Sequence, residues 1–214
     1  MLRSILKTIY YNFRIFPFKS AFRFPLIVGD TTIIRGIRKG CINIKVPIKR
    51  GMISIGRSFG SYGCYRGITS ILDFGPQGML IVNGRTAICT EFKISINGTL
   101  NIGENFDANN GLNCICKYSI TFGKNCLLGW DVTVIDSDGH QIHVDGVQSS
   151  EEKPINIGDN VWLGAKTTIL KGTQISNNSI IGLGTVVSGK YENNSIIIGY
   201  KGKMIKKNNL KWKK

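Results

Sequence analysis

The sequence predicts an all-β fold in which short parallel strands wind into a prism-shaped coil, a parallel β-helix. The first observation is a strict period of six between residues 155 and 190. The aliphatic residues of this period are Ile157, Leu163, Ile169, Ile175, Ile181 and Val187. The second observation is that the residues two positions earlier are β-branched or small: Ile155, Val161, Thr167, Thr173, Ser179 and Thr185. A period of six matches neither the helical period nor the alternation of a single strand, so it indicates short strands separated by bends.

Each hexad is expected to form one flat side of the prism, with three hexads closing a turn and turns stacking at about 4.8 Å. Glycines are expected at or near the corners, where a missing Cβ atom permits tight bends. These glycines are Gly158, Gly164, Gly182 and Gly184. The third observation is a weaker period of six upstream, in which a slip of two residues occurs. It runs through Ile96, Ile102, Ala108 and Cys114, and then through Phe122, Leu128 and Val134. The stretch ISIGRSFG at 53–60 has the form of an early turn, so we place the coil at 51–195.

Residues 1–50 are expected to form a basic amphipathic segment that caps the coil. Its first apolar residues, Leu2, Ile5, Leu6, Ile9, Tyr10 and Phe13, are interrupted by Arg3, Lys7, Asn12 and Arg14. This interruption excludes an apolar run of signal-peptide or membrane-spanning length. Two interpretations stay open: an end-cap helix that packs its Ile/Leu/Phe side onto the domain, and a helix that lies on a membrane surface.

The period of six stops between Asp136 and Pro154, so a loop at about 136–154 is expected to protrude from the coil. This loop holds His140 and His143, the two histidines of the chain. The final segment, 196–214, is rich in lysine, and we expect short helical segments at both ends of the chain.

Charge and cysteine content bound the partners and the compartment. The chain has 28 Lys and Arg against 13 Asp and Glu, a formal charge of +15, which favours an anionic partner. No motif of a known nucleic-acid-binding module is present, which argues against nucleic acid. The six cysteines lack paired C-x-x-C spacing and are interpreted as reduced core residues in a cytoplasmic protein, with peripheral contact at the inner face of the membrane as the further option.

Four ordered blocks carry a resemblance to a known family. They are NIGENFDANNGL, SITFGKNCLLGWDVTVIDSDGHQI, KPINIGDNVWLGAKTTILKGTQISNNSIIGLGTVVSGK and GYKGKMIKKN. Over residues 53–206 the chain resembles the hexapeptide-repeat acyltransferases, in particular the maltose/galactoside O-acetyltransferase branch and its polysaccharide-modifying relatives. The resemblance implies a left-handed β-helix, acetyl-CoA as the donor, and a homotrimer with active sites between subunits. The chain departs from these relatives at GYKGK, where they read G-N-P-A-K, and this leaves the contacts of the tail open.

The resemblance makes His140 the general base, and a neutral imidazole suits removal of a hydroxyl proton near neutral pH. Asp136 or Asp138 is expected to accept a hydrogen bond from the other ring nitrogen, and the sequence does not decide between them. The alternative is that His140 is an ordinary exposed loop histidine with no role in catalysis. His143 is either a second substrate-binding group or a solvent-exposed residue. A zinc site is not expected, because related β-helix enzymes use three histidines.

The resemblance also assigns binding residues. Asn109 would bind the acceptor, or it is a common corner residue. Trp162 would border the donor cleft, or it is ordinary packing, and the backbone N–H of Ala165 would receive the thioester oxygen. Gly164, Gly182 and Gly184 would leave room for the pantetheine arm of coenzyme A, and Lys190 would contact its phosphates.

The function implied is acetyl-CoA-dependent O-acetylation of a sugar hydroxyl in a bacterial capsule, exopolysaccharide or lipopolysaccharide. Two alternatives stay open. One is N-acetylation of a nucleotide-linked amino sugar, or a reaction like that of serine acetyltransferase. The other is a non-catalytic solenoid that binds glycan or membrane.

Overall fold

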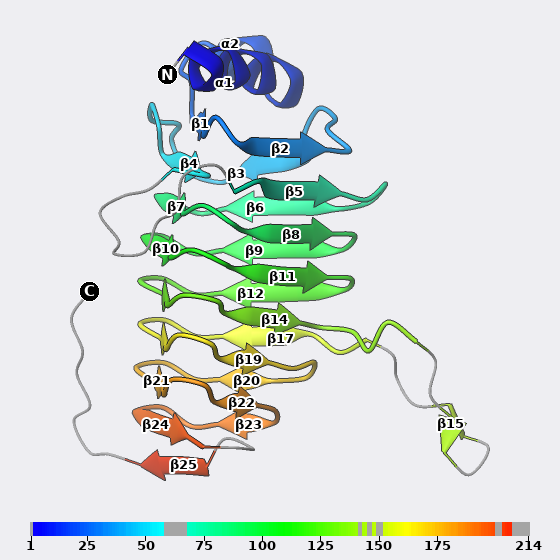
Figure 1. Cartoon of the computed structure of the whole chain (residues 1–214), viewed down its shortest axis with the longest axis vertical. Helices are drawn as coiled ribbons and strands as arrows, with labels where there is room; N and C mark the ends of the chain where they lie inside the picture. The colour runs from blue at the N-terminus through cyan, green and yellow to red at the C-terminus, as the bar shows by residue number, and fades with distance from the viewer. Residues whose placement is uncertain are drawn as a thin grey trace.

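A computed structural model describes residues 2–57, 68–140, 143–144, 147–148, 152–199 and 203–206. Three parallel sheets form the sides of a stacked coil (Figure 1). Sheet A contains β1 (Leu26–Val28), β4 (Ile53–Ile55), β7 (Thr86–Ile88), β10 (Phe106–Ala108), β13 (Leu127–Leu128), β18 (Trp162–Leu163), β21 (Ile180–Ile181), β24 (Ser195–Ile198) and β25 (Lys203–Lys206). Sheet B contains β2 (Thr32–Arg35), β5 (Ser70–Phe74), β8 (Lys93–Ile96), β11 (Asn113–Cys116), β14 (Thr133–Ile135), β19 (Thr168–Ile169) and β22 (Val186–Val187). Sheet C contains β3 (Ile42–Ile44), β6 (Met79–Val82), β9 (Thr99–Ile102), β12 (Ser119–Phe122), β17 (Ile155–Ile157), β20 (Gln174–Ile175) and β23 (Lys190–Tyr191).

The chain visits sheets A, B and C in turn, which confirms the predicted β-helix. The six aliphatic residues of the clean hexads are at most 2% exposed and fill the interior. Strand pairing sets Ile157 against Ile175, Leu163 against Ile181 and Ile169 against Val187, so each turn here consists of three hexads. We call residues 155–187 the narrow coils.

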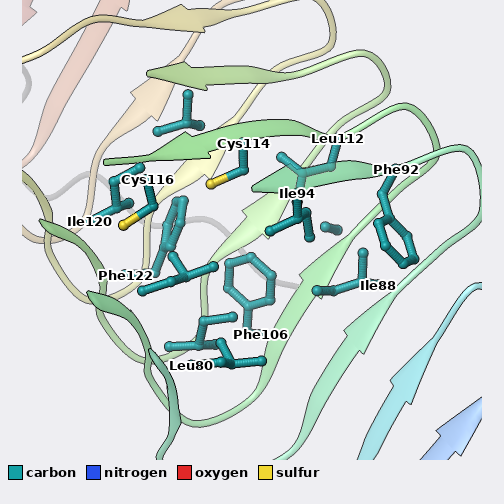
Figure 2. Close-up of a cluster of buried hydrophobic side chains, with 14 of the residues drawn as sticks. Leu80, Ile88, Phe92, Ile94, Phe106, Leu112, Cys114, Cys116, Ile120 and Phe122 are labelled. Atoms are coloured by element: carbon teal, nitrogen blue, oxygen red, sulfur yellow. The ribbon is translucent and has the colours of Figure 1, made fainter. Parts of the chain in front are cut away.

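Longer turns, each with two residues more than three hexads, precede the narrow coils. Ile102 pairs with Phe122, Ala108 with Leu128, and Cys114 with Val134. We call residues 82–134 the wide coils. The two additional residues per turn account for the slip seen in the sequence period, and they lengthen β8, β9, β11 and β12 to four residues each. Larger side chains fill this wider interior: Phe92, Phe106 and Phe122 are buried there, with the Phe106 and Phe122 ring centroids 5.1 Å apart (Figure 2).

Asparagine, rather than glycine, occupies most left-handed positions at the corner between sheets C and A. Asn105, Asn125, Asn160, Asn178 and Asn194 all have φ between 56° and 60°. Asparagine tolerates this conformation better than other residues with a Cβ atom. Their side chains also join successive turns, since Asn160 Nδ2 donates to Asn178 Oδ1 at 2.9 Å.

Helices α1 (Leu2–Ile15) and α2 (Phe18–Ala21) cover the N-terminal end of the coil (Figure 1). The edge strand β1 is hydrogen-bonded by side chains of α1. Asn12 Nδ2 donates to the Leu26 carbonyl at 2.7 Å, the Leu26 amide donates to Asn12 Oδ1 at 3.2 Å, and the Val28 amide donates to Thr8 Oγ1 at 3.0 Å. The side-chain amide of Asn12 therefore takes the place of a neighbouring strand. No helix among the described residues is both long and apolar enough to cross a membrane.

Three sequence expectations change at the ends of the chain. The end-cap helix is present, but it packs through Thr8, Tyr11, Asn12 and Ile15 and leaves its Ile/Leu side exposed. The coil already begins at β1, ahead of the boundary placed at residue 51. The sequence does not show this start, because the first turns are too irregular to contain hexads. A C-terminal helix is wrong for the described residues: β25 pairs antiparallel with β24, and residues 207–214 lie outside the description.

Candidate active site

The predicted loop leaves the coil between sheets B and C and is confirmed by the structure. After β14 the chain extends into an arm that carries β15 (His143–Val144) paired antiparallel with β16 (Val147–Gln148) (Figure 1). It returns to the coil at β17 after an antiparallel bridge between Ser137 and Glu152. The Lys117 ammonium lies 3.6 Å from the Glu152 carboxylate beside this bridge.

Asp136 fixes the base of the arm. Its side chain is fully buried, and its carboxylate accepts the backbone N–H groups of Lys117, Tyr118 and Ser119 at 2.7, 2.9 and 2.7 Å. One turn earlier, the amides of Asn97 and Thr99 donate to carbonyl groups of the following turn, Cys116 and Tyr118. The chain leaves the coil after β14, so the carboxylate of Asp136 supplies the acceptors that the next turn would otherwise provide.

The arm emerges where the coil becomes narrower. On the wide side, the four-residue strands β11 and β12 are joined by two residues, 117–118. On the narrow side, the two-residue strands β19 and β20 are joined by four residues, 170–173. The arm therefore stands on a step between the wide and the narrow coils.

His140 lies just beyond this anchored base, with its side chain exposed. Asp138 forms an ion pair with Lys171 on the narrow coil below. Within the described residues neither Asp136 nor Asp138 is hydrogen-bonded to His140, so the expected carboxylate partner is not seen in the single chain. His143 lies in β15, and its side-chain surroundings fall outside the described part of the chain.

A second group of predicted residues meets at the corner between sheets A and B. Asn109, Gly164 and Gly182 occupy the same position, the residue after the sheet A strand, in different turns. The column also contains Gly129, and its amides donate to carbonyls of the next turn: Asn109 to Leu128 at 2.9 Å, and Gly129 to Leu163, Gly164 to Ile181 and Gly182 to Ile197 at 2.8 Å each. The sequence prediction missed Gly129 and its neighbour Trp130, because the hexads are irregular there.

Close packing between turns explains two of these glycines. A Cβ atom on Gly164 would lie 2.6 Å from the Ile181 carbonyl oxygen, and one on Gly182 would lie 2.8 Å from Cγ2 of Ile198. Gly184 differs, since it has a φ of +70° and a Cβ atom there would meet nothing within 4 Å. Of the three glycines expected to leave room for a ligand, only Gly184 borders open space.

The residues after the column are suited to present backbone donors. In the described part of the chain the Ala165 amide has no hydrogen-bond acceptor, and the same holds for Trp130 and Leu183 at the equivalent corner position. The indoles of Trp130 and Trp162 and the side chain of Leu183 are exposed beside them. This corner therefore combines free N–H groups with apolar surface.

Sheet B separates the two groups. From Val132 at the A/B corner to Asp136 at the B/C corner the strand runs about 13 Å, four residues of extended chain. Lys190, in β23, lies at the B/C corner with the arm and not at the corner that holds Trp162 and Ala165. One chain thus places His140 and Ala165 at opposite edges of a sheet.

The cysteines near the arm are buried thiols. Burial, followed by the nearby charge of Asp136, raises the pKa of Cys116 to about 12. Burial likewise raises the pKa of Cys114 well above its usual range. Neither is suited to act as a thiolate nucleophile. Cys41, Cys89 and Cys126 are also reduced and buried, as expected, and Cys64 lies outside the described residues.

Comparisons with known proteins agree with this architecture. The family model for the hexapeptide repeat of succinyl-transferase matches residues 154–188. Galactoside O-acetyltransferase of Escherichia coli is 34% identical over 54% of this chain, and the match spans 57% of that enzyme. The crystal structure of the polySia-specific acetyltransferase NeuO is 19% identical over 89% of this chain and 90% of that chain, with a TM-score of 0.53, a likeness of fold.

A further relative matches along nearly the whole length. The Escherichia coli protein named "Putative lipopolysaccharide biosynthesis O-acetyl transferase WbbJ" is 31% identical over 87% of this chain and 89% of its own. That match includes the wide coils, the arm and the narrow coils. The chain therefore belongs to the hexapeptide-repeat acetyltransferase family.

Proposed function

We propose that this protein is an O-acetyltransferase that moves an acetyl group from acetyl-CoA to a sugar hydroxyl of a bacterial surface polysaccharide. The observation that carries the proposal is the exposed imidazole of His140 on an arm whose base is fixed by Asp136. The nearly full-length similarity to a relative named for lipopolysaccharide O-acetylation supports the acceptor class. The buried free thiols fit a reducing compartment, the cytoplasm, where the donor is made.

The proposed step is direct attack of the acceptor on the thioester. Neutral His140 removes the hydroxyl proton as the sugar oxygen bonds to the acetyl carbon, and the developing negative charge falls on the thioester oxygen. The free amide N–H of Ala165 is suited to donate a hydrogen bond to that oxygen. The carbon–sulfur bond then breaks, and the proton held by the imidazolium passes to the departing thiolate. The products are an acetyl ester and free coenzyme A.

We infer that the active site forms between subunits of a homotrimer. Because His140 and Ala165 lie at opposite edges of sheet B, a neighbouring subunit has to bring its own A/B corner to the arm. A closed threefold arrangement does this identically for every subunit. Trp162 and Gly184 of one subunit would then border the donor, while Asn109 and His143 would contact the acceptor and Lys190 a phosphate of coenzyme A.

We assign different tasks to the two carboxylates. Asp136 positions the arm through three backbone N–H groups, so it acts on catalysis through the placement of His140. Asp138 lies two residues before His140 and is exposed on the same arm, whereas the carboxylate of Asp136 is occupied by three backbone N–H groups, so Asp138 is the better candidate to orient the imidazole. Asp138→Asn is expected to lower kcat while leaving KM for acetyl-CoA unchanged.

The test is to incubate the purified protein with labelled acetyl-CoA and lipid-linked or soluble sugar acceptors. His140→Ala is expected to lower the rate by about 10²- to 10⁴-fold, the contribution of a general base. Ser188→Ala, at an exposed position of the same corner two turns below, is the matched control and should retain activity.

Three results would contradict the proposal. A product that resists mild alkali would be an amide, which indicates N-acetylation. An unchanged rate in His140→Ala would show that His140 is not the general base. Binding of glycan without any transfer would indicate a non-catalytic solenoid.

A further inference from the structure

The N-terminal end of the coil carries an apolar surface that the fold does not use. Leu2 and Leu6 of α1 are 71% and 58% exposed; Phe18 of α2 and Phe22, which follows α2, are 70% and 57% exposed. Ile5, Ile9 and Tyr10 are exposed on the same helix as Leu2 and Leu6. We call these seven side chains the end-cap face; the helices that carry them form the outermost layer of the molecule (Figure 1).

The geometry of α1 shows that this face is separate from the face that holds the fold together. Side chains advance by about 100° per residue around a helix. Thr8, Tyr11, Asn12 and Ile15 share one side and pack on the first turn of the coil. The apolar residues of α1 occupy the next arc, so an ordinary amphipathic packing helix, with its apolar arc inward, is not what this structure shows.

The aromatic side chains of α2 extend the face. Phe18 and Phe22 stack edge to face with centroids 4.7 Å apart, and Phe22 meets Phe13 of α1 at 5.1 Å. This cluster fixes α2 beside α1 while leaving the rings of Phe18 and Phe22 exposed. The apolar surface is therefore continuous across the two helices and is held in one shape.

Positive charge borders the face. Arg3 and Arg14 lie on the third arc of α1 and are exposed, as are Lys19 and Arg23 of the α2 region. Residues 1–50 contain eleven Lys and Arg and one acidic residue, Asp30. An apolar surface with a cationic border matches a bilayer of anionic phospholipid, whose acyl chains and headgroups offer both partners at the right depth.

A hollow beside the face provides a place for a headgroup. It has a volume of about 450 Å³ and is lined by Phe22, Arg23, Phe24, Ile48 and Arg50. Two guanidinium groups in one open hollow suit a phosphate. The hollow is lined in part by Phe22, a member of the end-cap face, so a phosphate bound there would lie beside the apolar surface.

We propose that the end-cap face docks this protein on an anionic phospholipid membrane. The face lies at the end of the coil, on the far side of the wide coils from the arm, so docking leaves His140 free. This inference concerns binding to a surface and holds whether or not the acetylation proposed above is correct.

The test is sedimentation of the full-length protein with vesicles of phosphatidylcholine, with and without phosphatidylglycerol. Wild-type protein is expected to bind only the anionic vesicles and to be released by high salt. Leu6→Glu/Ile9→Glu should lower the partition coefficient by at least about tenfold, because it places two carboxylates in the apolar face. Leu170→Glu, at an apolar residue of the narrow coils about as exposed as Ile9, is the matched control and should bind as wild type does.

A second variant pair tests the charged border without altering the apolar surface. Arg23→Gln/Arg50→Gln is expected to weaken binding by about fivefold for each charge removed. Lys93→Gln, an exposed lysine on sheet B, should have little effect. Failure of the wild type to bind anionic vesicles would overturn the proposal. Unchanged binding of Leu6→Glu/Ile9→Glu would also overturn it. A smaller oligomer mass in that variant would overturn it too, because the face would then be a contact between subunits.

Discussion

The wide and the narrow coils are built from the same three sheets, yet they differ in what fills them and in how tightly the sequence specifies them. The narrow coils hold one Ile, Leu or Val per side and repeat after three hexads. The wide coils add two residues to each turn and need phenylalanine at Phe92, Phe106 and Phe122 to fill their interior. The arm that carries His140 stands where one cross-section changes into the other. In this chain the place where the arm leaves the coil therefore coincides with a change in coil width as well as with an insertion.

The largest expected effect tests the filling of the wide coils. Phe106→Ala removes a fully buried ring and should lower the free energy of unfolding by about 4 kcal/mol, since neighbouring turns cannot close the cavity. Leu163→Ala in the narrow coils is the comparison and should cost about 3 kcal/mol. Urea unfolding followed by circular dichroism measures both. An equal or smaller cost for Phe106→Ala would mean that the wide interior is not held open by its aromatic residues.

The second effect concerns the step itself. Asp136→Ala leaves the N–H groups of Lys117, Tyr118 and Ser119 without their acceptor and should lower the free energy of unfolding by about 3 kcal/mol. Acetyl transfer should fall as well, because the arm loses its anchor. Hydrogen exchange at residues 117–119 reports the step directly. Unchanged protection of these amides would show that the carboxylate is not their essential partner.

Placing a phenylalanine in each kind of coil tests whether the two interiors differ in width. Leu163→Phe introduces a ring of the kind the wide coils accept into a narrow coil and should cost about 2 kcal/mol through overpacking. Leu128→Phe, at the equivalent position of a wide coil, should be tolerated better. Thermal unfolding of the two variants measures the loss of stability in each. Equal losses would argue that the two interiors have the same free volume.

The smallest effect lies at the corners, which both kinds of coil share. Asn178→Ala removes the side-chain amide that makes a φ of 56° tolerable and should lower the free energy of unfolding by about 1 kcal/mol. Asn178→Gly relieves the backbone cost but loses the bond from Asn160, so it should fall between wild type and Asn178→Ala. Similar results are expected at Asn125 in the wide coils. A large difference between the two sites would mean that corner conformation also depends on coil width.

The sequence predicts the narrow coils well because each turn there repeats the same physical requirement, one inward aliphatic residue per side. It predicts the arm for the same reason, since a missing repeat is visible against a regular one. The wide coils are harder, because two added residues per turn shift the pattern and Cys, Ala and Phe replace the aliphatic residues of the hexad. The early coil at β1–β3 is hidden for a similar reason.

The candidate site also contains some residues that the sequence predicts and others whose part only the structure reveals. His140, Ala165 and Trp162 lie in blocks that a family resemblance marks out. The task of Asp136 depends on amides 17 to 19 residues earlier in the chain, which only the stacked structure brings beneath it. The exposed face of α1 also escapes the sequence pattern, because hydrogen bonds between β1 and the side chains of Thr8 and Asn12 determine which side of the helix turns inward.

The way in which the two ends of the coil are covered affects whether the protein can assemble into fibres. A stack of parallel strands has a raw edge at each end, and such an edge can recruit another copy and propagate into a filament. At one end the side chains of Asn12 and Thr8 bond Leu26 and Val28 of β1, and at the other end β25 runs against β24 in the reverse direction. At the C-terminal end, the edge strands of sheets B and C, β22 and β23, are only two residues long. Loss of α1 would therefore uncover β1 as a template, and the shortened protein would be expected to associate with other copies through this one end.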